Sequence, residues 1–369
     1  MVYKGMSMIH NQQQQQQLPR IVTLSEIEEI VSTKQFAIQL IDAIKKGFTS
    51  YSNGEFNACP IQTMGAPPMA PFGDQSINSS TNYAAQTCVK SGYVTSSTHY
   101  VIKVAIGGHP FKNSGLMQLY SQETGKLETI LMDEGILTEL RTAAAGAVAA
   151  QLLAPRLTTN NTHNIGILGT GVQARYQLQY LKHITECRNV LVWGRTVPKV
   201  KQFIKDMTNE GWNIKAVDNA DELLDHCQLI VTTTSSRVPV LGKTWVSQGK
   251  QSPTKTPLHI TCIGSDATGK VELDPKLIKA ADLLVTDSRL QTKERGEFED
   301  MIANGTVEVE DIVEIGELAN RHELHRRKEG SNENDDDDCR LTIFDSSGVA
   351  VQDCVIAMMV NEALFAQDN

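Results

Sequence analysis

The feature that most constrains the fold is a glycine-rich turn between a strand-like run and a helical segment. Residues 165–168 form a short apolar run, and residues 172–183 have a helical pattern. Between them, Gly169-x-Gly171-x-x-Ala174 has the spacing that permits a tight turn, close approach to a ligand and packing of the helix on the strand. The helix N-terminus would then face the pyrophosphate of a dinucleotide. Gly169, at the tight turn, and Gly171, where the backbone can approach the pyrophosphate, are therefore predicted cofactor-binding residues.

The residues around and beyond this turn alternate between strand and helix patterns up to about residue 322. Such alternation is typical of a doubly wound parallel sheet. The expected segments are 164–168, 172–183, 190–193, 197–207, 220–224, 229–233, 259–263, 275–280 and 283–286. We therefore predict an α/β Rossmann domain over residues 157–322.

The flanking segments mix helices and strands without this regular alternation. The expected strands are 98–105, 116–121, 127–132 and 341–344, and the expected helices are 24–51, 138–154 and 351–365. These segments predict a second, α+β domain made of residues 21–156 and 341–369. The glutamine-rich start, 1–20, and the acidic stretch 323–340 are predicted to be a disordered tail and a disordered surface insertion.

Composition narrows the class of protein. The 369 residues carry a net charge of −9 without a long basic stretch, which argues against nucleic acid or an anionic membrane as the main partner. No apolar run reaches the roughly 18 residues that span a bilayer, and the start lacks the apolar core of a signal peptide. The seven cysteines are scattered without a CxxC pair, and His322 and His325 have the wrong spacing for a zinc helix. A cytoplasmic protein without a metal is expected.

The end of the second predicted strand bears on the choice of dinucleotide. An NAD site usually has an acidic residue there for the ribose hydroxyls, whereas this chain has Gly194-Arg195-Thr196, and an arginine would meet the 2′-phosphate of NADP. The third strand ends in the hydroxyl-rich run 232–235, where strand ends line a cofactor crevice. Further cofactor candidates are Arg195, Thr196, Thr233 and Thr234. We expect NADP(H) in preference to NAD(H), although a solvated loop arginine and a plain polar turn would give the same pattern.

Three charged residues lie within or just after apolar elements, where burial without a partner would cost several kcal/mol. Lys103 is inside the strand-like run Tyr-Val-Ile-Lys-Val, and Arg141 lies one turn into the alanine-rich helix. Asp266 follows the apolar run 259–263. Taken alone, each is equally consistent with a satisfied structural ion pair and with an active-site group.

Taken together, these residues and their surroundings resemble the ornithine cyclodeaminase/mu-crystallin family from about residue 25 to the end of the chain. The specific runs are Thr138-x-x-Arg141-Thr142-Ala143-Ala144 and Gly269-Lys270-x-Glu272-Leu273. Weaker matches are Lys103…Gly108-His109-Pro110, Gly169-x-Gly171-x-Gln173-Ala174, Gly264-Ser265-Asp266 and Phe344-x-Ser346-x-Gly348-x-Ala350. The resemblance implies a Rossmann domain, a substrate-binding and dimerisation domain, a homodimer, and an active site in the cleft between the domains.

The resemblance also implies roles for individual residues. Asp266 would be the acid/base at the substrate nitrogen, and Lys103 would meet the substrate carboxylate or polarise the reacting C–N centre. Arg141 would bind a cofactor phosphate or the substrate carboxylate. Hydride loss from the α-carbon of an amino acid creates an iminium, which a nearby carboxylate stabilises. Gly171, Val172 and Gln173 would cradle the pyrophosphate. The remaining cofactor contacts that the resemblance implies are Ile263, Gly264, Lys270 and Ser346.

Three functions remain open for a small amino or cyclic imino acid substrate. The best single expectation is a cyclodeaminase that converts L-ornithine to L-proline and ammonia. The second is an NADPH-dependent reductase of cyclic ketimines, or an amino-acid dehydrogenase. The third is a binder of NADPH and a small ligand without turnover, against which Asp266 argues. Gln62 stands where the family often has a carboxylate-binding arginine, and it is the remaining candidate for substrate binding.

Overall fold

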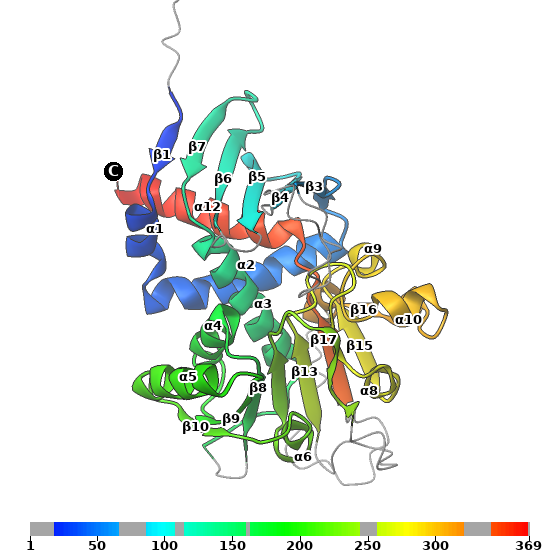
Figure 1. The fold of residues 1–369 in the computed structure, drawn as a ribbon. Coiled ribbons are helices and arrows are strands. Elements are labelled where there is room, and N and C mark those ends of the chain that lie inside the picture. The colour runs from blue at the N-terminus through cyan, green and yellow to red at the C-terminus, as the bar shows by residue number, and fades with distance from the viewer. Residues whose placement is uncertain are drawn as a thin grey trace, which may run out of the picture.

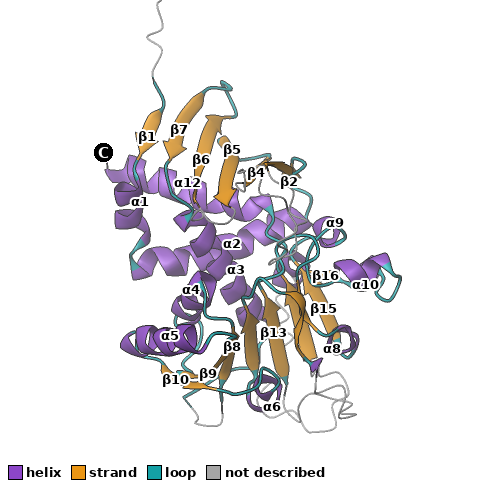
Figure 2. Cartoon of the chain, in the orientation of Figure 1, coloured by secondary structure: helices purple, strands orange, loops and turns teal. Residues whose placement is uncertain are grey.

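Two sheets, joined by a layer of helices, organise the described part of the chain (Figures 1 and 2). The computed structural model describes residues 18–65, 86–107, 114–159, 163–243, 257–320 and 341–367. The upper sheet has seven strands and is mainly antiparallel, and the lower sheet has eight strands, all of them parallel. The predicted combination of a Rossmann sheet with an α+β domain is confirmed.

The lower sheet is doubly wound. In sheet order its strands are β10 (Asn213–Ala216), β9 (Asn189–Trp193), β8 (Ile165–Leu168), β11 (Leu229–Thr232), β13 (Leu258–Cys262), β17 (Leu341–Asp345), β15 (Leu283–Thr286) and β16 (Val313–Glu314). The chain runs outward from β8 in one direction through β9 and β10, and then returns to continue on the other side with β11 and β13. This reversal next to β8 is the point at which open α/β sheets bind ligands.

Helices and a small sheet surround these strands. The helices are α4 (Val172–Leu181), α5 (Val197–Asn209), α6 (Glu222–His226), α8 (Pro275–Lys279), α9 (Arg289–Thr292), α10 (Glu299–Ala303) and α11 (Ile315–Asn320). The small sheet pairs β12 (Arg237–Leu241) with β14 (Val271–Leu273). Its two strands run beside the carboxyl ends of β11 and β13, so they help to shape the ligand-binding edge.

The position of β17 corrects one predicted domain boundary. Residues 341–369 were expected in the α+β domain, but β17 pairs with β13 on one side and β15 on the other, inside the parallel sheet. All five of its residues are buried, as befits a central strand. Because the polar segment 323–340 precedes it in sequence, β17 looked detached from the Rossmann pattern. That predicted insertion lies outside the described residues, as do residues 1–17 of the predicted tail, whereas Arg20 already pairs in a strand.

The upper sheet carries one layer of helices. Its strands are β1 (Arg20–Val22), β7 (Leu127–Leu131), β6 (Ser114–Ser121), β5 (His99–Gly107), β4 (Gln86–Val94) and β2 (Phe56–Ala58), with β3 (Gln62–Gly65) also paired to β4. The C-terminal helix α12 (Ala350–Gln367) packs against β4, β5 and β6. The single helix predicted over 24–51 is two helices, α1 (Leu24–Val31) and α2 (Lys34–Ser52), because the Thr33 hydroxyl caps α2 by accepting the Phe36 N–H at 3.1 Å.

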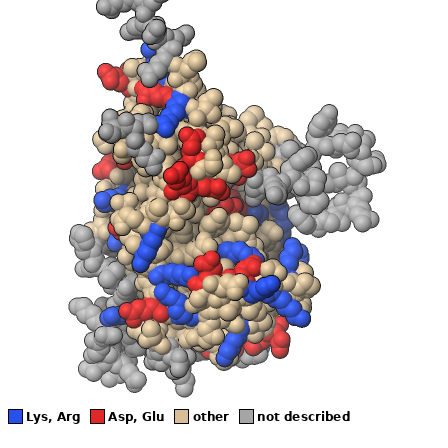
Figure 3. Space-filling model, turned by 90° about the vertical axis from the view of Figure 1, so that its left-hand side faces the viewer, with Lys and Arg blue, Asp and Glu red and all other residues tan. Residues whose placement is uncertain are grey.

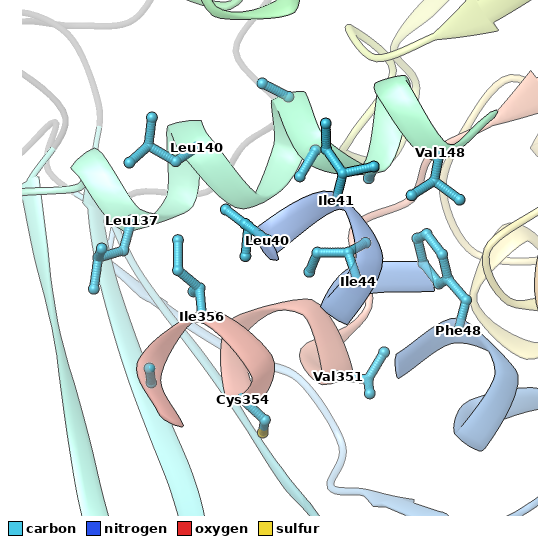
Figure 4. Close-up of a cluster of buried hydrophobic side chains, with 14 of the residues drawn as sticks. Leu40, Ile41, Ile44, Phe48, Leu137, Leu140, Val148, Val351, Cys354 and Ile356 are labelled. Atoms are coloured by element: carbon cyan, nitrogen blue, oxygen red, sulfur yellow. The ribbon is translucent and has the colours of Figure 1, made fainter. Parts of the chain in front are cut away.

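The alanine-rich helix α3 (Ile136–Leu153) joins the two halves of the molecule. It packs against α2 and α12 above and against α4 below, and its alanines are buried. At Gly146 any side chain would collide with Gln177 of α4, so small residues are what allow the close packing of these helices. Figure 4 shows the apolar side chains that α2, α3 and α12 place in one core, namely Leu40, Ile41, Ile44, Phe48, Leu137, Leu140, Val148, Val351, Cys354 and Ile356.

The described residues offer neither a membrane-spanning helix nor a cluster of metal ligands. No helix among them is both long and apolar enough to cross a membrane. Within the same residues, no group of three or more His, Cys, Asp or Glu side chains is placed to hold a metal ion. On the face in Figure 3, lysine and arginine side chains are interspersed with acidic ones.

Candidate active site

A crevice of about 970 Å³ opens at the carboxyl ends of β8, β9 and β11, beside the reversal of strand order. The glycine-rich turn forms one wall, and the segments after β9 and β11 form the others. The predicted residues on its lining are Gly169, Gly171, Arg195, Thr196, Thr233 and Thr234. The structure therefore brings these six together, although they come from three separate loops.

The two glycines of the turn serve different purposes. Gly169 has a φ of +110° and lies so close to Thr233 that a Cβ would be 2.6 Å from its hydroxyl oxygen. Gly171 precedes the first turn of α4, and a Cβ on it would meet no protein atom within 4 Å, so the added carbon would project into open space. The first turn of α4 has no acidic side chain, and Val172 in it is 57% exposed. These residues fit a pyrophosphate bound by backbone N–H groups at a helix N-terminus.

Three other predicted cofactor residues, Gln173, Thr233 and Thr234, already form hydrogen bonds within the protein. The Gln173 amide donates to the Glu139 backbone oxygen at 3.1 Å and to the Glu139 carboxylate, so its side chain joins α4 to α3. A contact from Gln173 to the cofactor would therefore use its backbone N–H. The Thr233 hydroxyl donates to the Leu168 carbonyl at 3.0 Å, and the Thr234 N–H donates to Glu272 at 2.5 Å. These bonds fix the end of β11 at the crevice.

The far wall of the crevice is rich in cations. Arg195 and Thr196 begin the segment that leads into α5, and Lys199 lies on the first turn of that helix. Arg237 and Lys243 also line the crevice, and Asp218 is the acidic residue on the lining. All of these side chains are exposed. Four cations against one carboxylate make the crevice suitable for a bound phosphate.

A second group of predicted residues lies at the neighbouring strand ends. Ile263 and Gly264 follow β13, and the Ser346 N–H donates to the carbonyl of Cys262, the last residue of β13, at 3.0 Å. The Gly264 N–H donates to Glu272 at 3.0 Å. The residues that line the crevice do not include Ile263, Gly264, Lys270 or Ser346, which lie next to it along the same edge.

Asp266 is held on the loop after β13 by Lys270, whose Nζ lies 2.6 Å from its Oδ1. Although 61% of the Asp266 side chain is accessible, desolvation by the surrounding protein is the largest influence and acts to raise its pKa. The positive charge of Lys270 and, to a smaller extent, those of Lys90 and Arg141 from the other half of the molecule outweigh this desolvation. The pKa of Asp266 therefore lies below its ordinary value. Asp266 is therefore ionised at neutral pH, within electrostatic reach of the upper domain.

Lys103 and Arg141 meet at one buried carboxylate. Lys103 Nζ and Arg141 Nε each lie 3.0 Å from Asp353 Oδ1, and all three side chains are at most 7% exposed. Lys103 comes from β5, Arg141 from α3 and Asp353 from the first turn of α12. Burial lowers the pKa of Lys103, partly opposed by Asp353. Lys103 and Arg141 carry two positive charges, whereas the carboxylate that they share carries one negative charge. The excess positive charge suits a site for an anion.

Lys90 belongs to the same cluster, and the sequence analysis did not identify it. It pairs directly with Lys103 across β4 and β5, so both side chains point to the same face of the sheet. Its Nζ donates to the Gly348 carbonyl at 2.6 Å. Burial is the main cause that lowers the pKa of Lys90 to about 8, and repulsion from the positive charges of Lys103 and Arg141 adds to it. The signal was available, because a lysine between β-forming residues is the same pattern that identified Lys103.

A polar network positions this cluster against the Rossmann sheet. Arg141 Nη1 donates to Gln352 Oε1 at 2.6 Å, and Gln352 Nε2 donates to Asp287 Oδ2 at 3.2 Å. Asp287, which follows β15, also accepts the backbone N–H groups of Ser347 and Gly348 at 3.1 and 2.8 Å. The loop between β17 and α12 is thereby fixed where the two domains meet. Asp287 and Gln352 are positioning residues that the sequence analysis missed.

The structure does not bring Gln62 to this cluster. Gln62 is exposed and pairs with Val89 of β4. Because neighbouring residues of a strand point to opposite faces, Gln62 shares the face of Val89 and lies opposite that of Lys90. Its neighbour Thr63, which pairs with Cys88, is on the lysine face instead. The predicted substrate contact of Gln62 is therefore not supported by the register of the strands.

Comparison with known proteins agrees with this geometry. Residues 21–368 match the ornithine cyclodeaminase/mu-crystallin family. The chain is 36% identical to alanine dehydrogenase of Archaeoglobus fulgidus over 248 residues, which cover 67% of this chain and 69% of that protein. It is 30% identical to iminosuccinate reductase of Paracoccus denitrificans over 244 residues, 66% of this chain and 68% of the relative.

A solved structure extends the likeness to nearly the whole chain. The structure of an archaeal alanine dehydrogenase dimer with bound NAD superposes with a TM-score of 0.76 and 26% identity, and covers 95% of this chain and 97% of that one. The fold, the glycine-rich crevice and the sequence match lead to one conclusion. The chain belongs to the ornithine cyclodeaminase/mu-crystallin family and is an enzyme of NAD(P)-dependent C–N chemistry.

Proposed function

We propose that the protein is an NADPH-dependent reductase of a small α-imino acid, which in reverse is an α-amino-acid dehydrogenase. One observation carries the proposal: Lys103 and Arg141 form a buried group of cations around Asp353, and Arg141 of this group also acts on the charge of an ionised acid, Asp266. An α-imino acid needs both, because its carboxylate requires cations and its protonated nitrogen requires a carboxylate.

The cations would bind and orient the substrate. Lys103 and Arg141 keep N–H donors beyond those directed at Asp353 and Gln352. A carboxylate bound by these donors lies in a site from which the protein has removed most water, where charge-assisted hydrogen bonds are strong. Asp353 and Gln352 would hold the two cations in place for this contact. The bound dinucleotide would supply the hydride or accept it.

Asp266 would act at the substrate nitrogen. In the direction of reduction its carboxylate would stabilise the positive charge of the protonated imine. In the direction of oxidation it would accept one proton from the ammonium of the amino acid, which frees the nitrogen lone pair for C=N formation. Lys270 keeps Asp266 ionised and in place, since it forms a direct ion pair with it. The convergence of Lys103 and Asp266 on one nicotinamide ring is part of this proposal.

The electrostatics disfavour L-ornithine, which was the best single substrate expected from the sequence. Ornithine carries a second ammonium, and the cluster already holds Lys90, Lys103 and Arg141 around one carboxylate. A further cation in such a site is repelled, because like charges in a low-dielectric environment interact strongly. Net reduction of an imino acid therefore accounts for the site better than cyclodeamination does.

The direct test is substrate turnover by the purified protein. NADPH oxidation is followed with pyruvate or oxaloacetate plus ammonium and with piperideine- and pyrroline-2-carboxylate, while ornithine is tested for proline and ammonia. We expect NADPH oxidation with at least one imino acid and no proline from ornithine. Asp266→Asn should lower kcat by about 10²- to 10⁴-fold and leave NADPH binding unchanged by fluorescence titration, whereas Glu294→Gln, an exposed control, should do neither. Proline formation without net NADPH oxidation would replace the reductase with a cyclodeaminase.

We propose NADP(H) as the preferred dinucleotide. The support is the group of cations that line the crevice, Arg195, Lys199, Arg237 and Lys243. Arg195→Asp should shift the ratio of kcat/KM for NADPH over NADH by roughly tenfold or more, because it replaces a phosphate partner with a carboxylate that suits ribose hydroxyls. Steady-state kinetics with both dinucleotides measures the shift, and an unchanged ratio would remove Arg195 from this role.

We also propose a homodimer formed through the outer face of the upper sheet. While α12 covers the face that carries Lys103, the opposite face presents the half-buried apolar side chains of Ile102, Val104, Leu116 and Ile130. A β-sheet face of this composition is typical of a covered surface. The related archaeal alanine dehydrogenase is described as a dimer. Light scattering of the purified protein should give twice the chain mass.

A further inference from the structure

Lys90 lies beside the proposed carboxylate site without an acidic partner of its own. Its side chain is buried, with 9% of the residue exposed, and it donates to one backbone oxygen, that of Gly348. An ammonium has three N–H donors, and no ion pair joins Lys90 to any acidic residue in the described part of the chain. The two lysines that face each other across β4 and β5 thus differ, since Lys103 has a carboxylate and Lys90 does not.

Arg295 is a second cation near the loop between β17 and α12, and it too has a donor without a partner. Its Nε is buried and has no hydrogen-bond partner among the described residues. Its backbone N–H donates to the Gln291 carbonyl at 3.2 Å, and Gln291 Nε2 donates to the Ser347 carbonyl at 2.8 Å, next to the Gly348 oxygen that Lys90 contacts. Arg295 also acts on the charge state of Lys90. Lys90 and Arg295 therefore approach the loop between β17 and α12 from two different domains.

The acidic groups near these two cations form their direct contacts with other residues, although Asp353 also acts on the charge of Lys90. Asp353 is shared by Lys103 and Arg141, and Asp266 is paired with Lys270. Asp133, within reach of Lys103, accepts the Leu137 N–H at the start of α3, and burial raises its pKa. Glu299, within reach of Arg295, accepts the Gly269 N–H at 3.1 Å. Buried donors left without partners are costly, and an anion placed between Lys90 and Arg295 would give partners to both.

We propose that Lys90 and Arg295 form a second anion subsite, so that the imino acid reduced here is a dicarboxylate. One carboxylate would meet Lys103 and Arg141, and the other would meet Lys90 and Arg295. This inference rests on the proposed reductase function and specifies its substrate class. An imine with a single carboxylate leaves Lys90 unpaired, and a diamino acid brings another cation to it.

The test compares two substrates that differ by one carboxylate. Oxaloacetate and pyruvate, each with excess ammonium, form small α-imino acids in solution, and NADPH oxidation reports their reduction. We expect kcat/KM with oxaloacetate to exceed that with pyruvate by on the order of 100-fold, because leaving a buried charge unpaired discriminates strongly. Lys90→Met should lower kcat/KM with oxaloacetate far more than kcat/KM with pyruvate, and so remove most of that preference. Lys126→Met, in the exposed turn between β6 and β7, is the matched control and should change neither.

A binding measurement separates this inference from the reductase itself. In the presence of NADP⁺, L-malate should raise the melting temperature of the wild type more than L-lactate does, and this difference should disappear in Lys90→Met. Arg295→Met, on a loop, provides the same test if Lys90→Met does not fold. Equal use of both imines together with equal binding of malate and lactate would overturn the dicarboxylate assignment and leave the reductase intact. No turnover of any imine, but Lys90-dependent binding of malate, would overturn the reductase and leave the subsite.

Discussion

The nucleotide crevice and the cation cluster are built in opposite ways. The crevice is formed around a continuous turn, Gly169 to Val172, and offers mainly backbone groups and exposed side chains. The cluster joins side chains of β4, β5, α3 and α12, and Lys103 and Asp353 are 250 residues apart in the chain. The crevice therefore depends on local conformation and the cluster on tertiary packing. The two regions should respond differently to substitution and to pH.

The largest expected effect is on stability at the cluster. Asp353→Asn keeps the shape of the side chain but leaves Lys103 and Arg141 without their shared negative charge. Breaking a buried ion pair in this way should lower the free energy of unfolding by about 3–5 kcal/mol. Asp206→Asn is the matched control, because Asp206 pairs with Arg175 at the surface, where solvent screens the pair and the expected loss is much smaller. Urea unfolding of the protein without cofactor measures both, and equal losses would show that burial does not distinguish the two pairs.

The same contrast explains how much of the molecule could be predicted from its sequence. The Rossmann sheet and the glycine-rich turn follow from local periodicity and spacing, so they were predicted correctly. Lys103 and Arg141 were identified because each interrupts an apolar element, but Lys90 was recognisable as their neighbour only from the register of β4 on β5. The register likewise places Gln62 on the face opposite that of Lys90, which local patterns could not show. The place of β17 in the sheet depended on long-range pairing, which local patterns do not contain.

The two glycines of the crevice offer an intermediate effect that separates folding from binding. Gly169→Ala places a Cβ at positive φ against Thr233 and should cost about 1–3 kcal/mol of stability. Gly171→Ala meets no protein atom and should change stability by less than about 0.5 kcal/mol, yet weaken NADPH binding by roughly tenfold or more, because the backbone can no longer approach the pyrophosphate closely. Urea unfolding and fluorescence titration give the two values. Unchanged NADPH affinity in Gly171→Ala would place the phosphates elsewhere.

The smallest expected effect is a pH dependence of stability that comes from the parallel sheet rather than from the cluster. Burial raises the pKa of Asp345, at the end of β17, to about 7, and it also raises the pKa values of the neighbouring Glu272 and Glu297. A carboxyl group with a raised pKa binds its proton more tightly in the folded chain than in the unfolded one. Its contribution to stability is therefore present at low pH and is lost as the pH rises through about 7. Asp353 has a lowered pKa, so its contribution changes only in acid.

The range from pH 6.5 to 7.5 shows this effect with little contribution from Lys90 of the cluster, because the pKa of Lys90 is about 8. Burial lowers the pKa of His259 to about 3, so that histidine opposes the trend mainly below pH 6.5, where it titrates in the unfolded chain. Within the range, the free energy of unfolding should fall by on the order of 1 kcal/mol. Asp345→Asn should flatten the slope, because the amide keeps an oxygen for the Glu297 N–H and its nitrogen can donate to the Thr292 hydroxyl. A wild type whose stability is constant over this range, or a variant with the same slope, would assign the pH response to other groups and remove this difference between the two regions.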